Sequence, residues 1–431
     1  MDLDFKIPKW VNKDIFHKML KQIFDGVDDI IYFDIARALT SGENYSTLML
    51  RVQIKMKLKD GRTRSSSFML KLPHETKEMK DMLTSLNFFH LENVVYQNVL
   101  SEMERMYTES GVELRFGAKS YRLSADNDKH YLLLEDLSCS GFRNANRLDG
   151  LDVEHTECVL RKLAQFHAVS ACRVATLGPY TEKRLFHKLD NKNGRSKIRQ
   201  VYALMAETFM ENLKNYKNCE MYRESLLFFF NNLIEWFVKA RVVHAQHFNV
   251  LNHGDIWTNN ILFKYKADGH VEETYFVDYQ NCNYGSPAQD LYVLLISSVH
   301  VDFKLKKFDH FVDYYYKHLV ENLKLLKYPL DIMSRQQMQE QLQVFGGWAF
   351  LTSFFIMGVA LLDPTDKAKF EYVMQDTPEG KDFQNLIYSN PRYIKHIEAI
   401  LPWLHQRDLM NPRNLLKDLS GNSSSKLEMK I

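Results

Sequence analysis

Residues 253–262, which read HGDIWTNNIL, carry the side chains on which the interpretation of this chain depends. Asp255 and Asn260 lie five residues apart, in what we expect to be a loop before a strand. The partner strand of the same hairpin ends in FVDY at residues 276–279, which adds a second carboxylate at Asp278. Three side chains that carry oxygen are therefore expected at one end of one hairpin.

The turn of this hairpin decides how the three side chains face one another. Residues 268–269 are Asp-Gly, a typical turn dipeptide. A two-residue turn puts Asn260 opposite Val277, and a three-residue turn puts it opposite Asp278. Either register keeps Asp255, Asn260 and Asp278 close. An Asp in a turn or an Asn at a strand entry is ordinary by itself, but the three together suit a hard cation such as Mg²⁺.

A second constellation comes from the N-terminal part of the chain. Lys71 lies in an apolar strand, FMLKL, and Glu92 lies on the apolar stripe of an expected helix. The rest of this stripe consists of Phe88, Phe89, Tyr96, Val99 and Met103. A carboxylate on a core-facing stripe is unfavourable unless a cation meets it, and Lys71 is the obvious candidate. Equally compatible with the pattern is a Glu92 that reaches solvent and a Lys71 that is an edge-strand charge.

The turn at residues 40–46 (TSGENYS) is the third candidate site. Gly42, with small polar neighbours such as Asn44, could offer backbone N–H groups to a phosphate. One glycine is a weak signal, and an ordinary turn at the entry to a strand explains the pattern at least as well.

The order of the expected elements indicates an α+β protein with two lobes. Before residue 138 strand signals dominate, with a short amphipathic helix at residues 12–24 and one helix inserted at 83–107. These strands are expected at residues 48–58, 65–72, 114–123 and 130–137. After residue 138 helices are expected at residues 153–169, 197–215, 224–241, 289–299, 308–323, 334–362 and 380–389.

We expect a β-rich nucleotide-binding lobe over residues 1–137, a helical catalytic and substrate lobe over residues 138–419, and a disordered tail at residues 420–431. The cleft between two lobes is the default place for a ligand. Residues 344–362 carry no charge, but their glycines and hydroxyl groups favour a buried helix over a membrane span.

Composition excludes several classes of protein. The 431 residues contain 56 Lys and Arg against 54 Asp and Glu, so no excess of positive charge points to a nucleic acid or an anionic membrane. The five cysteines show neither a disulfide framework nor zinc-ligand spacing, which favours a reducing cytosol. The N-terminal residues lack the pattern of a signal peptide. We expect a cytoplasmic protein without an obligate protein partner.

In chain order these features are the parts of kinase-type phosphoryl transfer, and HGD in place of HRD resembles the aminoglycoside and choline kinase branch. Five segments extend the likeness: GENY at 42–45, LEDL at 134–137 with GF at 141–142, LAQFHA at 163–168, HGDIWTNN at 253–260 and VDYQ at 277–280. Together they resemble the ecdysteroid kinase-like (CHK kinase-like) family of insects, which includes the juvenile-hormone-inducible proteins. The resemblance spans residues 30–404.

The resemblance implies a bilobed protein-kinase-like fold and ATP-dependent phosphorylation of a small-molecule hydroxyl. In the helical lobe it makes Asp255 the catalytic residue and Asn260 and Asp278 the Mg²⁺ ligands. His253 would brace the catalytic loop, and Asp290 would cap or orient a helix. Tyr-Gln at residues 279–280 replaces the Phe-Gly of protein kinases, so no activation-loop switch is implied.

In the β-rich lobe the resemblance implies that Lys71 holds the α- and β-phosphates of ATP and that Glu92 orients Lys71. Residues Glu135 to Leu137 would form the hinge that binds adenine. The single glycine of the phosphate loop, Gly42, departs from the glycine-rich pattern of protein kinases and weakens the case for tight closure over phosphate.

The expected function is therefore ATP- and Mg²⁺-dependent phosphorylation of a hydroxyl on a small apolar molecule such as an ecdysteroid. Aromatic side chains of the helical lobe would line such a pocket, although they would fill a large core equally well. Alternatives are a choline- or aminoglycoside-type kinase, a kinase that detoxifies xenobiotics, and a catalytically silent binding protein. A metal-dependent hydrolase using His253, Asp255 and Asp278 would leave Lys71 and Glu92 without a role.

Overall fold

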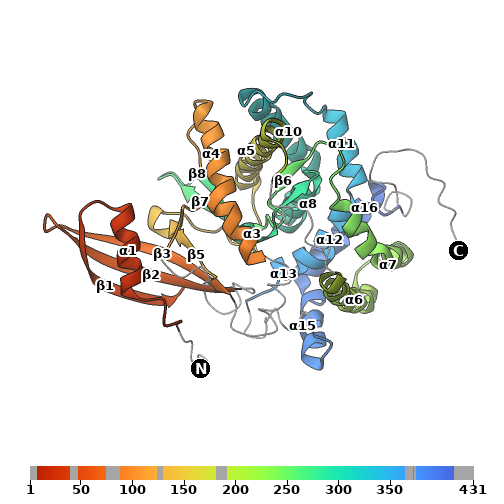
Figure 1. Ribbon diagram of the computed structural model, residues 1–431. Coiled ribbons are helices and arrows are strands. Elements are labelled where there is room, and N and C mark those ends of the chain that lie inside the picture. The colour runs from red at the N-terminus through yellow and green to blue at the C-terminus, as the bar shows by residue number, and fades with distance from the viewer. Residues whose placement is uncertain are drawn as a thin grey trace. The chain divides into compact units, whose positions relative to one another are not determined.

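The computed structural model describes residues 7–38, 47–73, 88–123, 130–180, 192–364, 372 and 375–411 (Figure 1). The chain is a mixed α+β protein, as predicted, and forms two compact units. The first lies within Met1–Thr84 and Ala118–Phe142, and the second within Ser85–Gly117 and Arg143–Ile431. The predicted phosphate-loop residues Gly42 and Asn44 and the predicted tail at residues 420–431 fall outside the described residues.

The first unit is built on a five-stranded antiparallel sheet with the strand order β1-β2-β3-β5-β4. Its strands are β1 (Val27–Arg37), β2 (Thr47–Leu58), β3 (Thr63–Pro73), β4 (Ser120–Tyr121) and β5 (Leu132–Glu135). Strand β1 was not predicted, because two register shifts against β2 break the alternation of its buried residues. The predicted strand over residues 114–123 is reduced to the two residues of β4.

Helix α1 (Lys13–Ile23) supplies the other half of the core of this unit. Asn12 caps it by accepting hydrogen bonds from the backbone N–H groups of Asp14 and Ile15. Phe16, Met19 and Leu20 recur at helical spacing and are buried in one cluster with the apolar residues of β2 and β3. The predicted amphipathic helix at residues 12–24 is confirmed.

The second unit is mainly helical. Its helices are α3 (Phe88–Val94), α4 (Leu100–Glu109), α5 (Val153–Leu177), α6 (Lys192–Asn212), α7 (Arg223–Ala240), α8 (Ala288–Ser297), α9 (Val301–Lys304), α10 (Phe308–Leu325), α11 (Arg335–Val344), α12 (Gly347–Leu351), α13 (Met357–Ala360), α15 (Pro378–Tyr388) and α16 (Pro391–Gln406). A π-helical turn at Val95–Val99 joins α3 to α4, so the predicted helix at residues 83–107 is continuous from Phe88 onward in the described part of the chain.

Helix α5 is the long central element of this unit, and α10 packs along it (Figure 1). Ser170 on α5 accepts a hydrogen bond from the backbone N–H of Leu251, at 2.8 Å. Leu251 lies in β6 (Val250–Asn252), which pairs with β9 (Asn283–Gly285). Between β6 and β9 in the chain lies a hairpin of β7 (Ile261–Tyr265) and β8 (Val271–Phe276). Helix α5 thereby fixes the strand that leads into residue 253.

The predicted single helix over residues 334–362 is wrong. The chain instead forms α11, α12, a π-helical turn at Thr352–Ile356 and α13, with a bend of 55° between α11 and the rest. The bend falls at Gly346–Gly347, where a Cβ on Gly347 would lie 2.3 Å from the ring of Trp236. The close approach of this ring to the backbone requires glycine and favours a break there. The residues of α12 and of the π-helical turn are nearly all buried.

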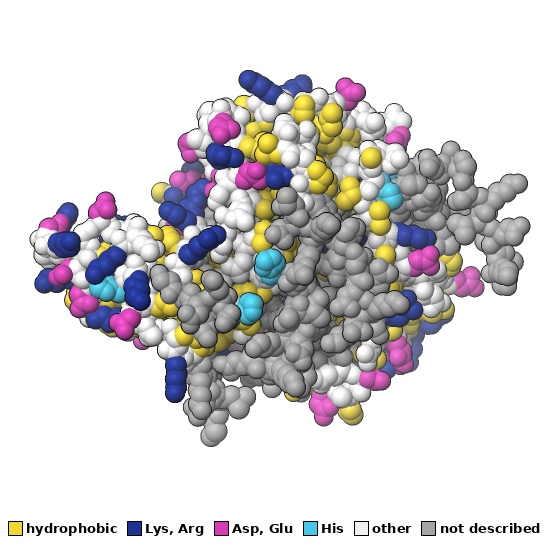
Figure 2. Space-filling view, viewed as in Figure 1, with side chains coloured by type: hydrophobic (Ala, Val, Ile, Leu, Met, Phe, Trp, Pro, Cys, Tyr) yellow, Lys and Arg dark blue, Asp and Glu magenta, His cyan; other side chains and the backbone are white. Residues whose placement is uncertain are grey.

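In the part of the chain that the structure describes, no single helix is long and apolar enough to cross a membrane; α11 and the α12–α13 segment pass such a test only as a bent pair. On the face shown in Figure 2, Lys and Arg side chains are interspersed with Asp and Glu rather than gathered in one patch. This agrees with the near-balance of charge in the sequence.

Candidate active site

The β7–β8 hairpin sets the geometry of the three residues predicted to act on a metal. Ile261 pairs with Phe276, and the backbone N–H of Val277 donates to the carbonyl oxygen of Asn260 at 3.0 Å. Asn260 therefore lies opposite Val277, which is the first of the two registers expected from the sequence. A bulge between Lys264 and Tyr265 shifts the pairing by one residue on the side of the turn, where Tyr265 lies opposite Val271.

The structure brings Asp255 and Asn260 into direct contact. The side-chain N–H groups of Asn260 donate to the main-chain oxygen of Asp255 at 2.8 Å and to its carboxylate Oδ2 at 3.1 Å. Asn260 is 7% exposed and ends the 3₁₀ turn η6 (Thr258–Asn260). Because the amide nitrogen is used in this way, the amide oxygen is the atom of Asn260 that can coordinate a cation.

Asp278 follows β8 in a left-handed backbone conformation, with φ 66° and ψ 58°. Few residues other than glycine adopt these angles, and such residues cluster at functional sites. The left-handed residue redirects the chain from β8 into the 3₁₀ turn η7 (Tyr279–Asn281). The Asp278 carboxylate accepts a hydrogen bond from the side-chain N–H of Gln280 at 3.2 Å.

This set of donors fits a hard cation: two carboxylates and one amide oxygen, all on the short segments around β7 and β8. Among the described residues, no group of three His, Cys, Asp or Glu side chains is arranged to hold a metal ion. A cation here would therefore use the Asn260 oxygen or oxygens of a bound phosphate in addition to carboxylates.

His253 links the loop to the strand that carries Asp278. It is fully buried, and its Nε2–H donates to the main-chain oxygen of Val277 at 3.0 Å. Burial lowers the pKa of His253, so the imidazole is neutral near pH 7 and its proton lies on Nε2. A neutral, buried His253 is suited to brace the loop and is poorly placed to exchange a proton with solvent.

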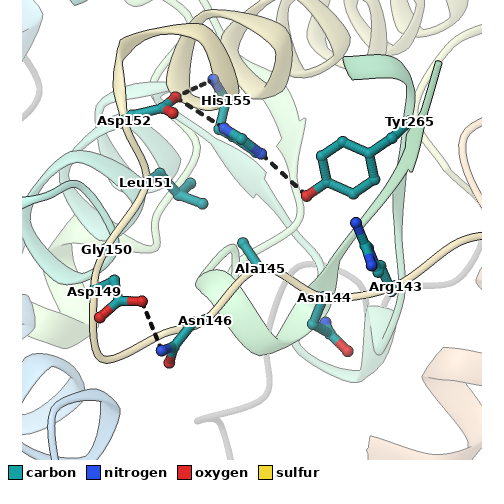
Figure 3. A pocket seen from close by; sticks show the side chains of 10 residues that line it. All are labelled: Arg143, Asn144, Ala145, Asn146, Asp149, Gly150, Leu151, Asp152, His155 and Tyr265. Atoms are coloured by element: carbon teal, nitrogen blue, oxygen red, sulfur yellow. Dashed lines mark hydrogen bonds and ion pairs between the residues drawn. The ribbon is translucent and has the colours of Figure 1, made fainter. Parts of the chain in front are cut away.

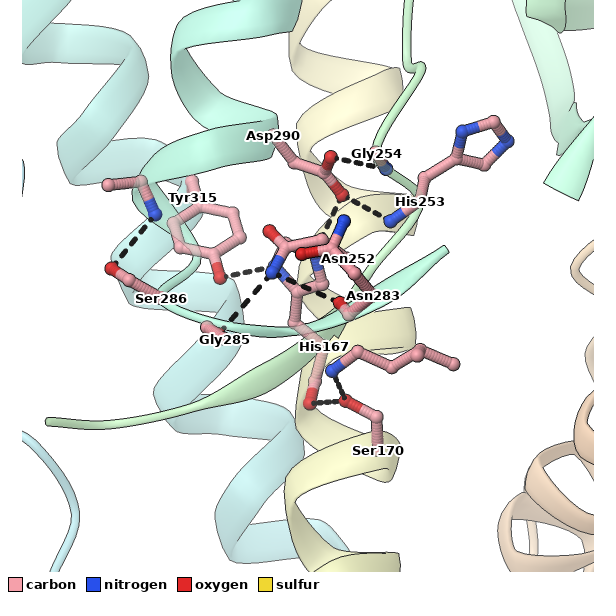
Figure 4. Close-up of polar contacts among 12 residues, drawn as sticks. His167, Ser170, Asn252, His253, Gly254, Asn283, Gly285, Ser286, Asp290 and Tyr315 are labelled. Atoms are coloured by element: carbon pink, nitrogen blue, oxygen red, sulfur yellow. Dashed lines mark hydrogen bonds and ion pairs between the residues drawn. The ribbon is translucent and has the colours of Figure 1, made fainter. Parts of the chain in front are cut away.

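Asp290 in the first turn of α8 holds the same loop from the other side (Figure 4). Its carboxylate accepts hydrogen bonds from the backbone N–H groups of His253, at 2.6 Å, and Gly254, at 2.8 Å. It also meets the Nε2 atom of His167 at 3.2 Å, and the Nδ1 atom of His167 lies 2.7 Å from the hydroxyl of Tyr315. The expected role of Asp290 in orienting a helix is therefore better described as orienting the loop.

His167 and Tyr315 are site residues that sequence reasoning did not assign. With Nε2–H donating to Asp290, the Nδ1 atom of His167 accepts from the Tyr315 hydroxyl, and all three side chains are buried. The chain Tyr315–His167–Asp290 connects α10, α5 and α8 to the loop backbone. The motif at residues 163–168 was the available signal for His167, whereas Tyr315 has no local signal in the sequence.

Gly254 is required by two independent constraints. Its φ is +78°, and a Cβ there would lie 2.2 Å from the main-chain oxygen of Asn281. The side-chain N–H of Asn281 in turn donates to the carbonyl oxygen of Gly254 at 2.9 Å. The loop that carries Asp255 and the turn that follows Asp278 are thus held together by a close approach of their backbones and by the Asn281 side chain.

Glu92 lies in the second unit, beside the turn that follows Asp278. Helix α3 packs against η7, and Glu92 is only 1% exposed, so the alternative in which Glu92 reaches solvent is wrong. The pKa of Tyr96 is held well above its ordinary value by burial and, after burial, by the carboxylates of Glu92 and Asp278. The Tyr96 ring meets the Tyr279 ring edge to face at 5.2 Å. Glu92 and Asp278 are therefore both close enough to Tyr96 to act on it.

Lys71 lies in the first unit, in the middle of the sheet. It is 2% exposed, and its strand β3 has β2 on one side and β5 on the other, with Met49 and Leu132 directly opposite Lys71. The alternative of an edge-strand charge is therefore wrong. Because Lys71 and Glu92 belong to different units, their pairing stays a prediction.

The predicted hinge residues follow at the end of β5. Glu135 closes the strand: its backbone N–H donates to the Lys119 carbonyl at 2.8 Å, and its carboxylate accepts from the Lys119 N–H at 3.3 Å. Leu137 is buried and begins a 3₁₀ turn (Leu137–Ser140). Asp136, within the same predicted hinge, is the N-cap of this turn.

Asp136 ties the turn to the sheet of the first unit. Its carboxylate accepts hydrogen bonds from Ser67 Oγ at 2.7 Å and Ser138 Oγ at 2.6 Å, and it pairs with Arg51 Nε at 2.9 Å. Burial opposes the charge of Asp136, but the hydrogen bonds from Ser138 and Ser67 and the charge of Arg51 outweigh it and lower the pKa. The turn after β5 is therefore held rigidly.

A pocket with a volume of about 360 Å³ lies in the second unit and is lined by none of the residues predicted for the site (Figure 3). Its walls include Arg143, Asn144 and Tyr265. Several of the polar side chains around it are bonded to one another: Asp152 to His155 at 2.8 Å, and His155 to Tyr265 at 3.0 Å. One of its lining residues, Asn144, also contacts the backbone of the turn that carries Asn260.

Comparison with known proteins places these features in a family. No curated protein matches the chain significantly. The model of the ecdysteroid kinase-like family matches residues 41–328, which is more than half of the 431 residues and includes every residue predicted for the site. The match covers the HGD loop, the β7–β8 hairpin, Lys71 and Glu92 together. The chain therefore belongs to the ecdysteroid kinase-like family.

Proposed function

We propose that this protein is a cytoplasmic kinase that uses ATP and Mg²⁺ to phosphorylate a hydroxyl of a small molecule. The observation that carries the proposal is the contact of the Asn260 side chain with Asp255. The main-chain oxygen of Asn260 also accepts a hydrogen bond from Val277, the residue before Asp278. In a member of this family, such an arrangement has the side chains that phosphoryl transfer needs.

In this proposal Asp255 accepts the proton of the acceptor hydroxyl while the acceptor oxygen forms a bond to the γ-phosphorus and the bond to the ADP oxygen breaks. Asn260 and Asp278 would hold Mg²⁺, which neutralises charge on the phosphate oxygens when it is bound. Positioning and charge stabilisation supply most of the acceleration in this chemistry. The braces formed by His253 and Asp290 are the protein's contribution to that positioning.

The roles of the nucleotide-binding residues are also proposals. Lys71 would bind the α- and β-phosphates and Glu92 would orient it, while Glu135 and Leu137 would bind the adenine edge. Burial of Lys71 and Glu92 supports a functional role, because buried charges persist where a partner or a ligand stabilises them.

The acceptor is proposed to be an apolar alcohol, with ecdysteroids the first to test. The family supports this assignment. The aromatic side chains expected to line the pocket do not add to it, since Phe229 stacks on Phe350 at 4.3 Å and Phe209 meets Phe354 at 4.6 Å in the core. These rings are buried against one another and fill the interior of the second unit.

The test is transfer of labelled phosphate from ATP in the presence of Mg²⁺ to a panel of acceptors, with the Asp255→Asn variant as control. The panel contains ecdysteroids, other apolar alcohols, glycosides, choline, ethanolamine and an aminoglycoside. We expect label in an apolar alcohol with the unmodified protein only. Turnover confined to the cationic acceptors would reject the apolar assignment, and no transfer to the panel or to a metabolite extract would reject the proposed activity.

A further inference from the structure

Asn144 makes an unusual set of contacts with the turn that carries Asn260. Its side-chain nitrogen lies 2.8 Å from the main-chain oxygen of Asn259, 2.9 Å from that of Ile261 and 3.4 Å from that of Thr258. The two shortest contacts are to the residues immediately before and after Asn260. One amide group on a distant segment therefore holds the backbone on both sides of the predicted metal ligand.

Asn144 is itself held in place by its neighbour. Arg143 and Phe263 of β7 exchange two backbone hydrogen bonds, at 2.9 Å and 2.8 Å. The Arg143 guanidinium also lies over the ring of Tyr265, 4.7 Å from its centre (Figure 3). The segment is thus an added strand position beside β7, and the Asn144 side chain starts from a fixed backbone.

The backbone of Asn260 makes one hydrogen bond inside its own turn and one to the end of β8. Its N–H donates to the carbonyl of Trp257, within the same 3₁₀ turn, and its oxygen accepts from Val277. A single 3₁₀ turn is a weak local structure, so contacts from outside it decide how accurately the Asn260 side chain is aimed. Hydrogen bonds that orient a metal ligand from behind typically change metal affinity or activity by roughly 10–100-fold when they are removed.

We propose that Asn144 is a positioning residue for Asn260 and thereby sets the affinity of the site for its divalent cation. The inference rests on the proposed function, in which Asn260 is a metal ligand. It assigns a role to the segment after Phe142 that no motif of the sequence suggested. In the nearby pocket the side chains of Asp152, His155 and Tyr265 are bonded to one another.

The decisive variant is Asn144→Asp. It replaces the side-chain nitrogen by oxygen at nearly constant shape, so that a carboxylate without a hydrogen to donate faces the three carbonyl oxygens. Asn144→Ala removes the donor without adding repulsion and should have a smaller effect. The matched control is Asn146→Asp in the same loop: the Asn146 amide donates to Asp149 at 2.7 Å, so this variant introduces a comparable repulsion, but the hydrogen bonds of the Asn146 side chain to described residues stay within its own loop.

The primary measurement is Mn²⁺ binding by electron paramagnetic resonance, with the metal alone and with a non-hydrolysable ATP analogue. Hydrogen exchange over residues 257–263 reports the turn itself. We expect Asn144→Asp to weaken Mn²⁺ binding roughly 10–100-fold and to speed exchange in that peptide, with Asn144→Ala in between and Asn146→Asp near the unmodified protein. The Mg²⁺ concentration for half-maximal turnover should rise in the same order.

The outcomes separate this inference from the proposed function. Mn²⁺ binding that depends on Asn144, in a protein that phosphorylates nothing, would refute the function and support the positioning role. Unchanged Mn²⁺ affinity in Asn144→Asp, or equal losses in Asn146→Asp, would overturn the positioning role while leaving metal-dependent turnover of the unmodified protein intact. A protein that binds no Mn²⁺ with nucleotide would overturn both.

Discussion

At the scale of single residues, Asp255 is the side chain whose replacement tests the chemistry most directly. Asp255→Asn keeps the shape, and the new amide oxygen can still accept the hydrogen bond from Asn260. The loop should therefore keep its structure while losing its proton acceptor. We expect turnover to fall by roughly 10²–10⁴-fold, with nucleotide binding retained. Single-turnover kinetics and calorimetric ATP binding check this, and near-normal turnover would show that Asp255 is not the base.

Gly254 provides a second prediction, with a control built into the chain. Gly254→Ala places a Cβ 2.2 Å from the Asn281 oxygen at a φ of +78°, so the loop must shift. Gly269→Ala has a similar φ of +89° but meets nothing within 4 Å, and it should cost only about 1–2 kcal/mol of conformational strain. We expect Gly254→Ala to lower the free energy of unfolding by more than Gly269→Ala and to abolish turnover.

Urea denaturation of both glycine variants makes the comparison. Equal losses of stability in the two would mean that the close approach of Gly254 to Asn281 does not exist in solution. Normal turnover in Gly254→Ala would lead to the same conclusion by a separate route.

At the scale of secondary-structure elements, the hairpin was predictable and its supports were not. Asp-Gly at residues 268–269 and the alternating strands on either side are local signals, so β7, β8 and the proximity of Asn260 to Asp278 follow from the sequence. The braces from Asp290, His167 and Asn144 come from segments 36 to more than 100 residues away from the loop. Such contacts depend on tertiary packing, which periodicity does not reveal.

The errors at this scale have physical causes of the same kind. Strand β1 lacks an alternating pattern because it is bulged. Residues 344–362 are apolar on all sides because they are buried, so their sequence indicates neither the length of a helix nor the position of a break. The break at Gly347 depends on Trp236 from α7, a partner far away in sequence. Short-range rules therefore recover helix α1, where the cap and apolar stripe are local.

Helices α8, α9 and α16 meet at a buried lysine that yields a prediction of pH dependence. Lys304 on α9 is 1% exposed; its ammonium nitrogen contacts the main-chain oxygen of Ile296 and lies 2.9 Å from Nδ1 of His396. Burial lowers the pKa of Lys304 to about 7. It also lowers the pKa of His396 to about 2, with the charge of Lys304 as the next cause. Above pH 7 the pair is therefore largely neutral.

The sign of the effect follows from proton binding. Between about pH 7 and the ordinary lysine value of 10.5, the unfolded chain binds a proton at residue 304 that the folded chain has released. Stability therefore rises with pH in this window, by up to about 1.4 kcal/mol per pH unit from this group. Lys304→Met removes that contribution. Urea denaturation of both proteins at pH 7, 8 and 9 should give a steeper rise for the unmodified protein, and parallel curves would show that Lys304 stays charged.

At the scale of the whole molecule, the two units each bury one member of a predicted ion pair. Lys71 is held in mid-sheet in the first unit, and Glu92 lies beside the Asp278 turn in the second. Sequence reasoning identified both residues because charges at apolar positions are conspicuous. The sequence does not show that α3, which carries Glu92, belongs to the helical unit, because this depends on the packing of α3 against η7.

The pairing of Lys71 with Glu92 is the prediction that joins the two units. If the two side chains act together on nucleotide, Lys71→Met and Glu92→Gln should each reduce kcat/KM for ATP, and the double variant should lose little more than either single one. A coupling of 0.5–3 kcal/mol, which is about 2- to 150-fold in kcat/KM, is typical of directly interacting residues.

The matched control is Lys162→Met, which removes a buried lysine that already pairs with Glu273 at 2.9 Å within the second unit. In the double variant of Lys162→Met and Glu92→Gln, the losses in kcat/KM of the two single variants should add. Additive losses for Lys71→Met with Glu92→Gln as well would mean that the two residues act separately, and the kinase-type role assigned to Glu92 would have to be given up.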